Sequence, residues 1–170
     1  FGEILKYSLI RDKKFFNFIK KNSKEILNGR NYDILKYLVL KSSKNKIHFV
    51  IADERESNKR MILNFGHTFA HGIESSNKFS KKINHGEAVL IGMLLAIKLS
   101  VQKNICSLKT LKDVEEIYLS NKLPLNLSKY LNREQIKNIP KLMVNDKKNN
   151  DEKINLILLK RIGKTTIPGK

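Results

Sequence analysis

Residues 60–74 carry side chains of the types that bind metals, phosphates and hydroxyl groups. Read as an α-helix at about 100° per residue, this stretch sorts into two faces. Apolar residues fill one face, and the other holds a guanidinium, an amide, two imidazoles and a carboxylate, from Arg60, Asn64, His67, His71 and Glu74. A chain with 34 lysines and arginines would ordinarily place lysines on a solvent-facing helix surface. The lack of lysine on this face therefore predicts a helix with a ligand-binding surface.

His85 is a third histidine in a position to bind a ligand. It stands just before a long apolar run, residues 89–99, which predicts a buried helix. A side chain at the start of a helix is fixed by the backbone and still projects freely. Three of the four histidines therefore belong to two adjacent predicted helices that could pack together.

Two kinds of metal site are consistent with these histidines. His67 and His71 are four residues apart, so both could bind one ion from a single helix. The zinc-protease pattern needs a glutamate directly after the first histidine, and Thr68 stands there, so that class is excluded. Alternatively, His67 binds with His85 and a carboxylate from elsewhere, because two histidines and one glutamate are a recurrent zinc set. The residues leave both arrangements open, as well as core histidines hydrogen-bonded to backbone.

A phosphate site is the second chemistry that these residues suggest. Arg60 and Asn64 precede His67 on its predicted face, and the planar guanidinium of arginine suits an oxyanion. Other cations could converge on the same place: Lys46, Lys147 and Lys148. Each lysine taken singly is equally consistent with a solvated surface position.

The elements that must position these side chains are mainly helices. Hydrophobic periodicity and stop signals predict helices over residues 1–9, 13–27, 31–41, 46–53, 60–74, 86–102, 110–119 and 133–138. A polar turn over residues 145–153 precedes two short strands, residues 154–159 and 165–167, joined through Gly163. We expect one mainly α-helical domain, residues 1–170, with a small terminal β-hairpin.

Composition limits the classes of protein to which the chain can belong. It has 170 residues with 41% hydrophobic content, which suits a single packed domain, and we expect no membrane span and no signal peptide. Its one cysteine, Cys106, excludes an internal disulfide and fits a cytoplasmic location. The net charge of +18 comes mostly from dispersed lysine without interleaved aromatic residues, so we expect no nucleic-acid binding.

Five motifs in order give the chain a specific resemblance to the C-terminal domain of 3-dehydroquinate synthase, a sugar-phosphate cyclase. The resemblance runs from Glu3 to about Lys164, and it departs modestly at Ser8, at Ala70-His71-Gly72 and at Ile83-Asn84. The motifs are Glu3-Ile4-Leu5-Lys6-Tyr7, the stretch from Lys46 through Asp53-Glu54-Arg55-Glu56, residues 60–74 with His85-Gly86-Glu87-Ala88-Val89 and Ile91-Gly92-Met93, Asp146-Lys147-Lys148, and residues 156–163.

The resemblance implies a role for each matching residue. Glu3, His67 and His85 would bind a divalent metal, usually zinc, with cobalt as an alternative. The substrate's hydroxyls, carboxylate and phosphate would be contacted by Lys6, Lys46, Arg60, Asn64 and His71. One of Lys147 and Lys148 would also face the phosphate, with Lys147 as our choice. His71 would move protons, because imidazole titrates near neutrality.

The implied reaction converts 3-deoxy-arabino-heptulosonate 7-phosphate, a seven-carbon keto-acid sugar phosphate, into 3-dehydroquinate and phosphate in the shikimate pathway of aromatic amino acid biosynthesis. NAD would take a hydride from a ring hydroxyl and return it after phosphate has left, and ring opening and an intramolecular aldol step would follow. The metal would act as a Lewis acid on that hydroxyl, and the cations would stabilise phosphate and enolate charge.

The sequence has no glycine-rich dinucleotide-binding segment, although the family binds NAD on an N-terminal α/β domain. The chain, which starts without methionine, is therefore expected to be the metal- and substrate-binding half, to fold alone and not to catalyse. Its expected partners are the NAD-binding domain, the phosphorylated substrate and, as is common in the family, a second copy in a homodimer. Three alternatives remain: a sister cyclase that closes a different ring, a metal-dependent polyol dehydrogenase, and a basic nucleic-acid-binding module.

Overall fold

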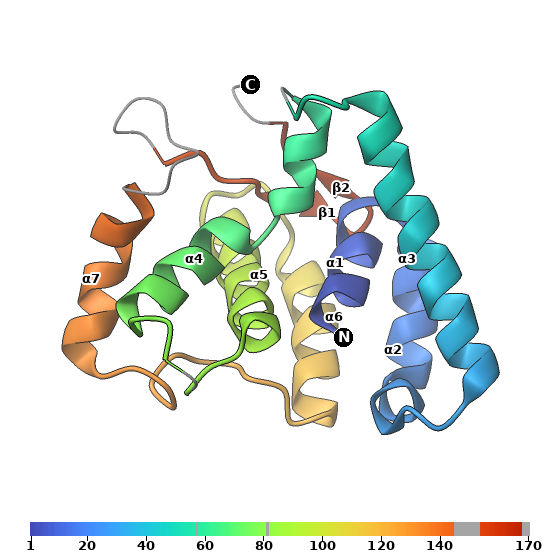
Figure 1. Ribbon diagram of the computed structural model, residues 1–170, viewed down its shortest axis with the longest axis horizontal. Helices are drawn as coiled ribbons and strands as arrows, with labels where there is room; N and C mark the ends of the chain where they lie inside the picture. Colours follow the sequence, from blue (N-terminus) through green and yellow to red (C-terminus); the bar gives the residue numbers. More distant parts are fainter. Residues whose placement is uncertain (57, 81, 145–153, 168–170) are drawn as a thin grey trace.

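The computed structural model describes residues 1–56, 58–80, 82–144 and 154–167, and it confirms a mainly helical fold with a small terminal hairpin (Figure 1). The short antiparallel hairpin pairs Leu159 with Thr165. In chain order the elements are α1 (Gly2–Arg11), α2 (Lys13–Asn28), α3 (Tyr32–Ala52), the 3-10 helix η1 (Lys59–Asn64), α4 (His67–Ser76), α5 (His85–Gln102), α6 (Leu108–Ser120), α7 (Arg133–Val144), β1 (Leu159–Arg161) and β2 (Lys164–Thr165).

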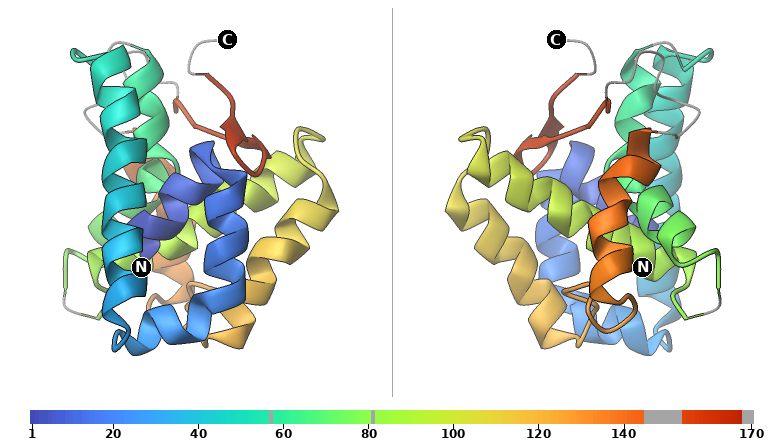
Figure 2. Two further views of the ribbon diagram at one scale, coloured as in Figure 1. Left: turned by 90° about the vertical axis from the view of Figure 1, so that its right-hand side faces the viewer. Right: turned by 90° about the vertical axis from the view of Figure 1, so that its left-hand side faces the viewer.

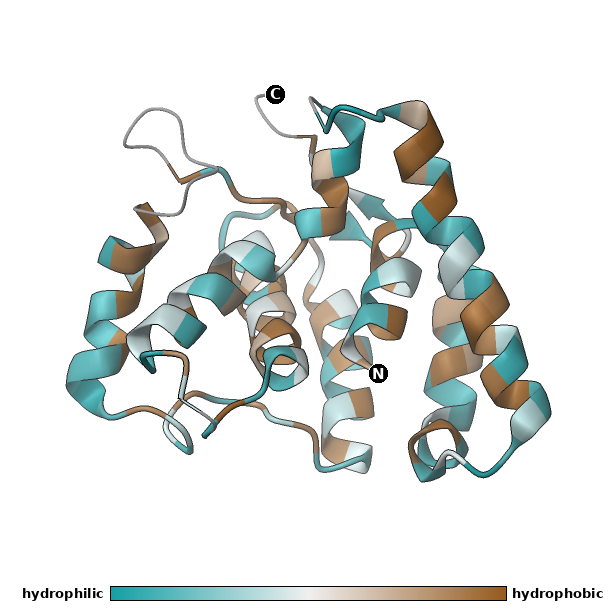
Figure 3. Ribbon diagram, in the orientation of Figure 1, coloured by the Kyte–Doolittle hydropathy of each residue, from teal (hydrophilic) through white to brown (hydrophobic). Residues whose placement is uncertain are grey.

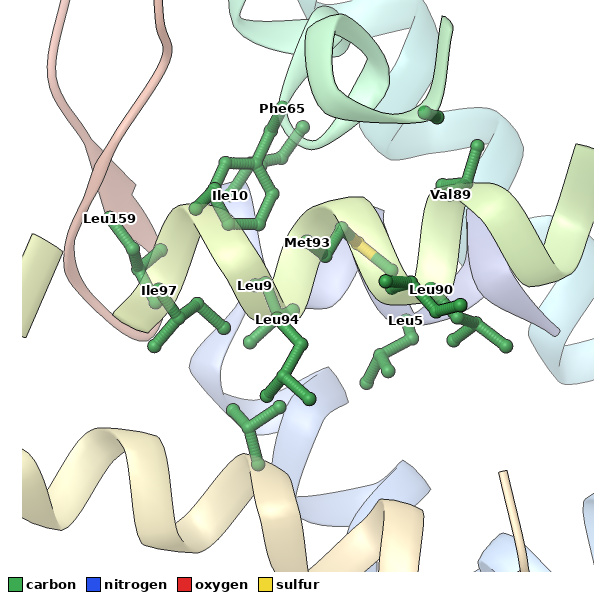
Figure 4. Packing of buried hydrophobic residues seen from close by; sticks show 14 of the residues in the cluster. Leu5, Leu9, Ile10, Phe65, Val89, Leu90, Met93, Leu94, Ile97 and Leu159 are labelled. Atoms are coloured by element: carbon green, nitrogen blue, oxygen red, sulfur yellow. The ribbon is translucent and has the colours of Figure 1, made fainter. Parts of the chain in front are cut away.

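Helix α5 is the centre of the fold, because it is apolar on nearly every side. It packs against α1, α4, α6 and β1, and Figure 4 shows Met93, Leu94 and Ile97 of α5 in the same buried cluster as Leu5, Leu9 and Leu159. Its length and hydropathy would also suit a membrane-spanning helix, but 56% of that window is buried inside the fold, as in the core helix of a globular domain.

Helix α3 is one continuous helix that joins the two predicted helical ranges, residues 31–41 and 46–53. Within the joining segment Asn45 is buried, and its Oδ1 accepts a hydrogen bond of 2.7 Å from Arg11 Nη1 on α1. A tertiary contact thus supports the helix between the two predicted ranges. The outer side of α3 keeps apolar side chains exposed, including Val39 and Ile51 (Figure 3).

The predicted single helix over residues 60–74 is also wrong, because η1 and α4 are separate elements. Gly66 lies between them with φ 79°, in the left-handed region that favours glycine. At this point α4 crosses α5 very closely: a Cβ on Gly92 would overlap the Gly66 carbonyl oxygen. The chain bends here because α5 leaves no room for a continuous helix with side chains at both positions.

The C-terminal third differs from the prediction in its boundaries. Helix α7 extends to Val144 with Pro140 inside it and packs against α4, whereas the sequence predicted a helix ending at residue 138 (Figure 2). Both strands are shorter than predicted, and each overlaps its predicted range at one residue only, Leu159 and Thr165. Ser100 Oγ on α5 accepts a hydrogen bond of 3.0 Å from the Leu159 backbone N–H, which ties the hairpin to the core. The predicted turn over residues 145–153 lies outside the described residues.

Candidate metal and substrate site

Glu3 and His67 meet although 64 positions separate them in the chain. Helix α1 packs against α5 and η1, which places its first turn beside the start of α4. Glu3 Oε1 lies 3.4 Å from His67 Nε2, and Glu3 Oε2 accepts a hydrogen bond of 2.7 Å from Lys6 Nζ. Burial alone would raise the pKa of Glu3, but the Lys6 and His67 charges and the Lys6 hydrogen bond lower it below its usual range. The carboxyl is therefore an anion at neutral pH.

The imidazole of His67 is held in the form that a metal needs. Its Nδ1 lies 3.3 Å from the Phe65 carbonyl oxygen, an acceptor, so Nδ1 carries the hydrogen and Nε2 keeps its lone pair toward Glu3. Burial, together with the Lys6 ammonium, lowers the pKa of His67 to about 4. His67 is thus neutral across the physiological range, as a metal ligand must be.

His85 begins α5 and lies beside His67, with 5.6 Å between the ring centroids. The helix start is fixed by a capping box in which the Asn84 side chain accepts from the Glu87 N–H and the Glu87 carboxylate accepts from the Asn84 N–H. Tyr130 Oη adds a hydrogen bond of 3.0 Å to Glu87 Oε1. The backbone that carries His85 is therefore well anchored.

These three residues fit a divalent metal by the chemistry of their donors: one carboxylate and two imidazoles, from three elements that pack together. Among the residues that the structure describes, no three His, Cys, Asp or Glu side chains are already gathered at ligand spacing. Lys6 instead occupies one oxygen of Glu3. A bound cation would have to draw Glu3 and His85 inward around His67.

His71 lies one turn after His67 on α4, with 6.0 Å between the ring centroids and the planes nearly perpendicular. Lys6 is 3% exposed and its charge is close enough to influence the pKa of His67. Both residues thus lie near His67. Tyr7, which the sequence analysis left without a role, hydrogen-bonds Glu3, and burial with the Glu3 charge raises the pKa of Tyr7 to about 12.

Arg60 and Asn64 lie on η1, beside α1 and α3, where an acidic loop engages them. Arg60 Nη1 donates to the Glu54 carbonyl oxygen at 2.7 Å, and Asn64 Nδ2 donates to Glu56 Oε1 at 2.8 Å. Asp53 Oδ2 accepts from the Arg60 backbone N–H at 3.0 Å, which anchors the start of η1. The sequence placed this loop in a family motif without a role, and the structure shows that its acceptors hold Arg60 and Asn64.

Of the other lysines predicted to contact the substrate, Lys46 lies on α3 and is exposed. Lys147 and Lys148 lie outside the described residues.

Of two surface cavities, one is lined by a predicted site residue and the other is not. The larger, about 660 Å³, lies between α4 and α7 and contains none of the predicted site residues. The smaller, about 320 Å³, opens beside His85. Its lining includes one predicted metal ligand, His85; the lining residues are Glu74, Phe79, Ser80, Ile83, Asn84 and His85.

Comparison with known proteins points to one family. Residues 1–149 match the family model described as 3-dehydroquinate synthase C-terminal. The 3-dehydroquinate synthase of Pelagibacter ubique (strain HTCC1062) is 42% identical over 163 residues, which are 96% of this chain and 44% of that protein. The same enzyme from Dictyoglomus thermophilum is 42% identical over 98% of this chain and 45% of its own length. The chain thus spans less than half the length of these relatives.

Solved structures show the same fold in related cyclases. A 2-epi-5-epi-valiolone synthase from Streptomyces hygroscopicus subsp. jinggangensis 5008, with NAD+ and Zn2+ bound, superposes with a TM-score of 0.82 at 20% identity over 97% of this chain and 44% of that one. A 2-deoxy-scyllo-inosose synthase complexed with carbaglucose-6-phosphate, NAD+ and Co2+ gives a TM-score of 0.79 at 23% identity, covering 97% and 45%. At these identities the likeness concerns the fold alone.

Proposed function

The chain belongs to the 3-dehydroquinate synthase C-terminal family, and from that membership we propose that it is the metal- and substrate-binding part of a 3-dehydroquinate synthase. The whole enzyme would convert 3-deoxy-arabino-heptulosonate 7-phosphate into 3-dehydroquinate and inorganic phosphate, with NAD and a divalent metal. The observation that supports the proposal is that Glu3 and His85, from two other elements, each lie beside the neutral imidazole of His67.

Glu3, His67 and His85 would hold the metal, with zinc as our first choice and cobalt as the alternative. When bound, the metal would act as a Lewis acid on the substrate hydroxyl that is oxidised. The support in this chain is chemical: an ionised carboxylate and the free Nε2 atom of His67 face each other. Two histidines and one glutamate leave a coordination position open for a substrate oxygen.

The cationic and amide side chains around this centre would bind and orient the substrate. Arg60 is already held by the Glu54 carbonyl, so its guanidinium has less freedom to lose when it binds phosphate. Lys6, buried beside Glu3, would stabilise negative charge that develops on the substrate. His71, next to His67, would accept or donate a proton, and Lys46, Asn64 and one of Lys147 and Lys148 would complete the contacts.

The rest of the enzyme would supply NAD binding. The chain covers 44–45% of the length of these relatives, so we propose that an NAD-binding domain lies in the remainder of the gene product. We further propose, from the family resemblance alone, that the assembled enzyme is a cytoplasmic homodimer. Transient oxidation and reduction by NAD leave no net redox change, so the products are 3-dehydroquinate and phosphate alone. The isolated 170 residues should not turn over substrate, because half of the catalytic machinery would be missing.

The test is phosphate release by the full-length gene product supplied with the seven-carbon substrate, NAD and zinc. We expect release that stops when a chelator is added and returns with added zinc or cobalt. A matched reaction with the sugar-phosphate substrate of a sister cyclase should release no inorganic phosphate. Release only from the sister substrate would reassign the enzyme to another branch of the cyclases, and no release from either would overturn the proposal.

A further inference from the structure

Glu74 makes a contact with His85 that the residue roles above do not use. It lies two turns after His67 on α4, and its Oε1 is 2.9 Å from Nδ1 of His85 at the start of α5. The Glu74 side chain is 16% exposed, whereas that of His85 is 54% exposed. A largely buried carboxylate thus holds a largely exposed imidazole.

Stability does not explain this contact. An ion pair with one exposed partner contributes only about 0–1 kcal/mol. Helices α4 and α5 are already fixed against each other by their close crossing at Gly66 and Gly92 and by buried residues such as Ala70 and Ile73. The contact therefore acts mainly on the imidazole itself, which at this exposure would otherwise move among rotamers.

The hydrogen bond also selects the tautomer of His85. A carboxylate only accepts, so the hydrogen lies on Nδ1 and the lone pair is on Nε2. His67 shows the same arrangement, with its Nδ1 facing the Phe65 carbonyl oxygen. Both imidazoles thus keep Nε2 for a ligand, and histidines that bind metals commonly donate their other N–H to a carboxylate or a carbonyl in this way.

We infer that Glu74 is the positioning residue for His85, setting its tautomer and ring orientation for metal binding; the inference rests on the proposed metal site. The 320 Å³ cavity that both residues line would give a cation and substrate access to the imidazole. In this arrangement Glu74 acts through the Nδ1–H of His85 and is not one of the three proposed ligands.

The test measures zinc affinity of the metal-free full-length gene product by competition with a chromogenic chelator. Glu74→Ala removes the acceptor and should weaken zinc binding about 10–100-fold, the usual effect of removing such a partner. Glu74→Gln keeps an oxygen acceptor and should lose less. Glu115→Ala is the matched control, because Glu115 on α6 pairs with Lys98 at 3.4 Å instead of with a histidine, and it should bind zinc as the wild type does.

A second readout separates positioning from a structural role. Ring nitrogen NMR of the metal-free protein, labelled with ¹⁵N-histidine, should show one histidine that leaves the Nδ1–H tautomer in Glu74→Ala but not in Glu115→Ala, at an unchanged thermal midpoint. Wild-type zinc affinity in Glu74→Ala would overturn this inference alone. A wild-type protein that binds no zinc would overturn the metal site and the inference together.

Discussion

Replacing Gly92 by alanine should destabilise the chain although alanine is the better helix former. Gly92 lies inside α5, where propensity alone predicts a gain of about 0.5–1 kcal/mol for alanine. The new methyl group would overlap the Gly66 carbonyl oxygen and crowd the Ala70 backbone nitrogen. Since these atoms are backbone, no side-chain rotation relieves the clash. Overpacking typically costs about 1–3 kcal/mol, and a clash with backbone belongs at the upper end, so the net loss should be about 2 kcal/mol.

Urea unfolding followed by circular dichroism measures this loss. Gly86→Ala is the matched control, because it is the same change in the same helix and its Cβ would meet only the Asn84 side-chain oxygen, at 3.3 Å. We expect Gly86→Ala to stay within about 0.5 kcal/mol of the wild type, as substitutions outside special sites usually do. In Gly92→Ala, α4 would also shift against α5 and separate His67 from His85, so zinc affinity should fall with stability. A Gly92→Ala chain at least as stable as the wild type would refute the close crossing.

Three further predictions concern the site. The unfolded chain takes up a proton on His67 near pH 6.5 and the folded chain only near pH 4, so the free energy of unfolding of the metal-free protein should fall by about 3 kcal/mol as the pH drops through this window. Urea titrations should show a shallower pH dependence in His67→Gln, and an equal slope in both proteins would contradict the buried neutral imidazole. Arg60→Ala should raise KM for the phosphorylated substrate about 10–100-fold, as expected for a lost charge-assisted contact, while zinc affinity is kept; steady-state kinetics with unchanged KM and kcat would remove Arg60 from the site. His85→Ala should weaken zinc binding more than Glu74→Ala does and leave the circular dichroism spectrum unchanged, and full metal retention would contradict its role as a ligand.

The sequence predicts most of the helices, because their apolar residues recur at helical spacing and their ends carry recognisable caps. Asp12 and Gly29, for example, cap the two ends of α2. Prediction from the sequence fails where contacts between distant parts of the chain determine whether a helix bends or continues. The bend at Gly66 arises because α5 crosses there, and the buried Oδ1 of Asn45 inside α3 accepts its hydrogen bond from Arg11 on another helix. Neither contact leaves a signal in local periodicity.

The site divides in the same way. The sequence shows directly, by helical spacing, that His67, His71 and Glu74 share one polar face of α4. The meeting of Glu3 with His67 depends on how α1 docks, so it came from the family resemblance and not from the local pattern. The hydrogen bonds that fix the imidazoles, from His67 to Phe65 and from His85 to Glu74, depend on backbone geometry and helix packing, and they required the structure.

Anomalous diffraction at the zinc edge, from crystals of the full-length gene product soaked in zinc, tests most directly whether Glu3, His67 and His85 form the metal centre. We predict one strong peak about 2.0–2.2 Å from a carboxylate oxygen of Glu3 and from Nε2 of His67 and His85. A peak held by His67 and His71 without Glu3 and His85, or none at these residues, would contradict the metal site and the function built on it.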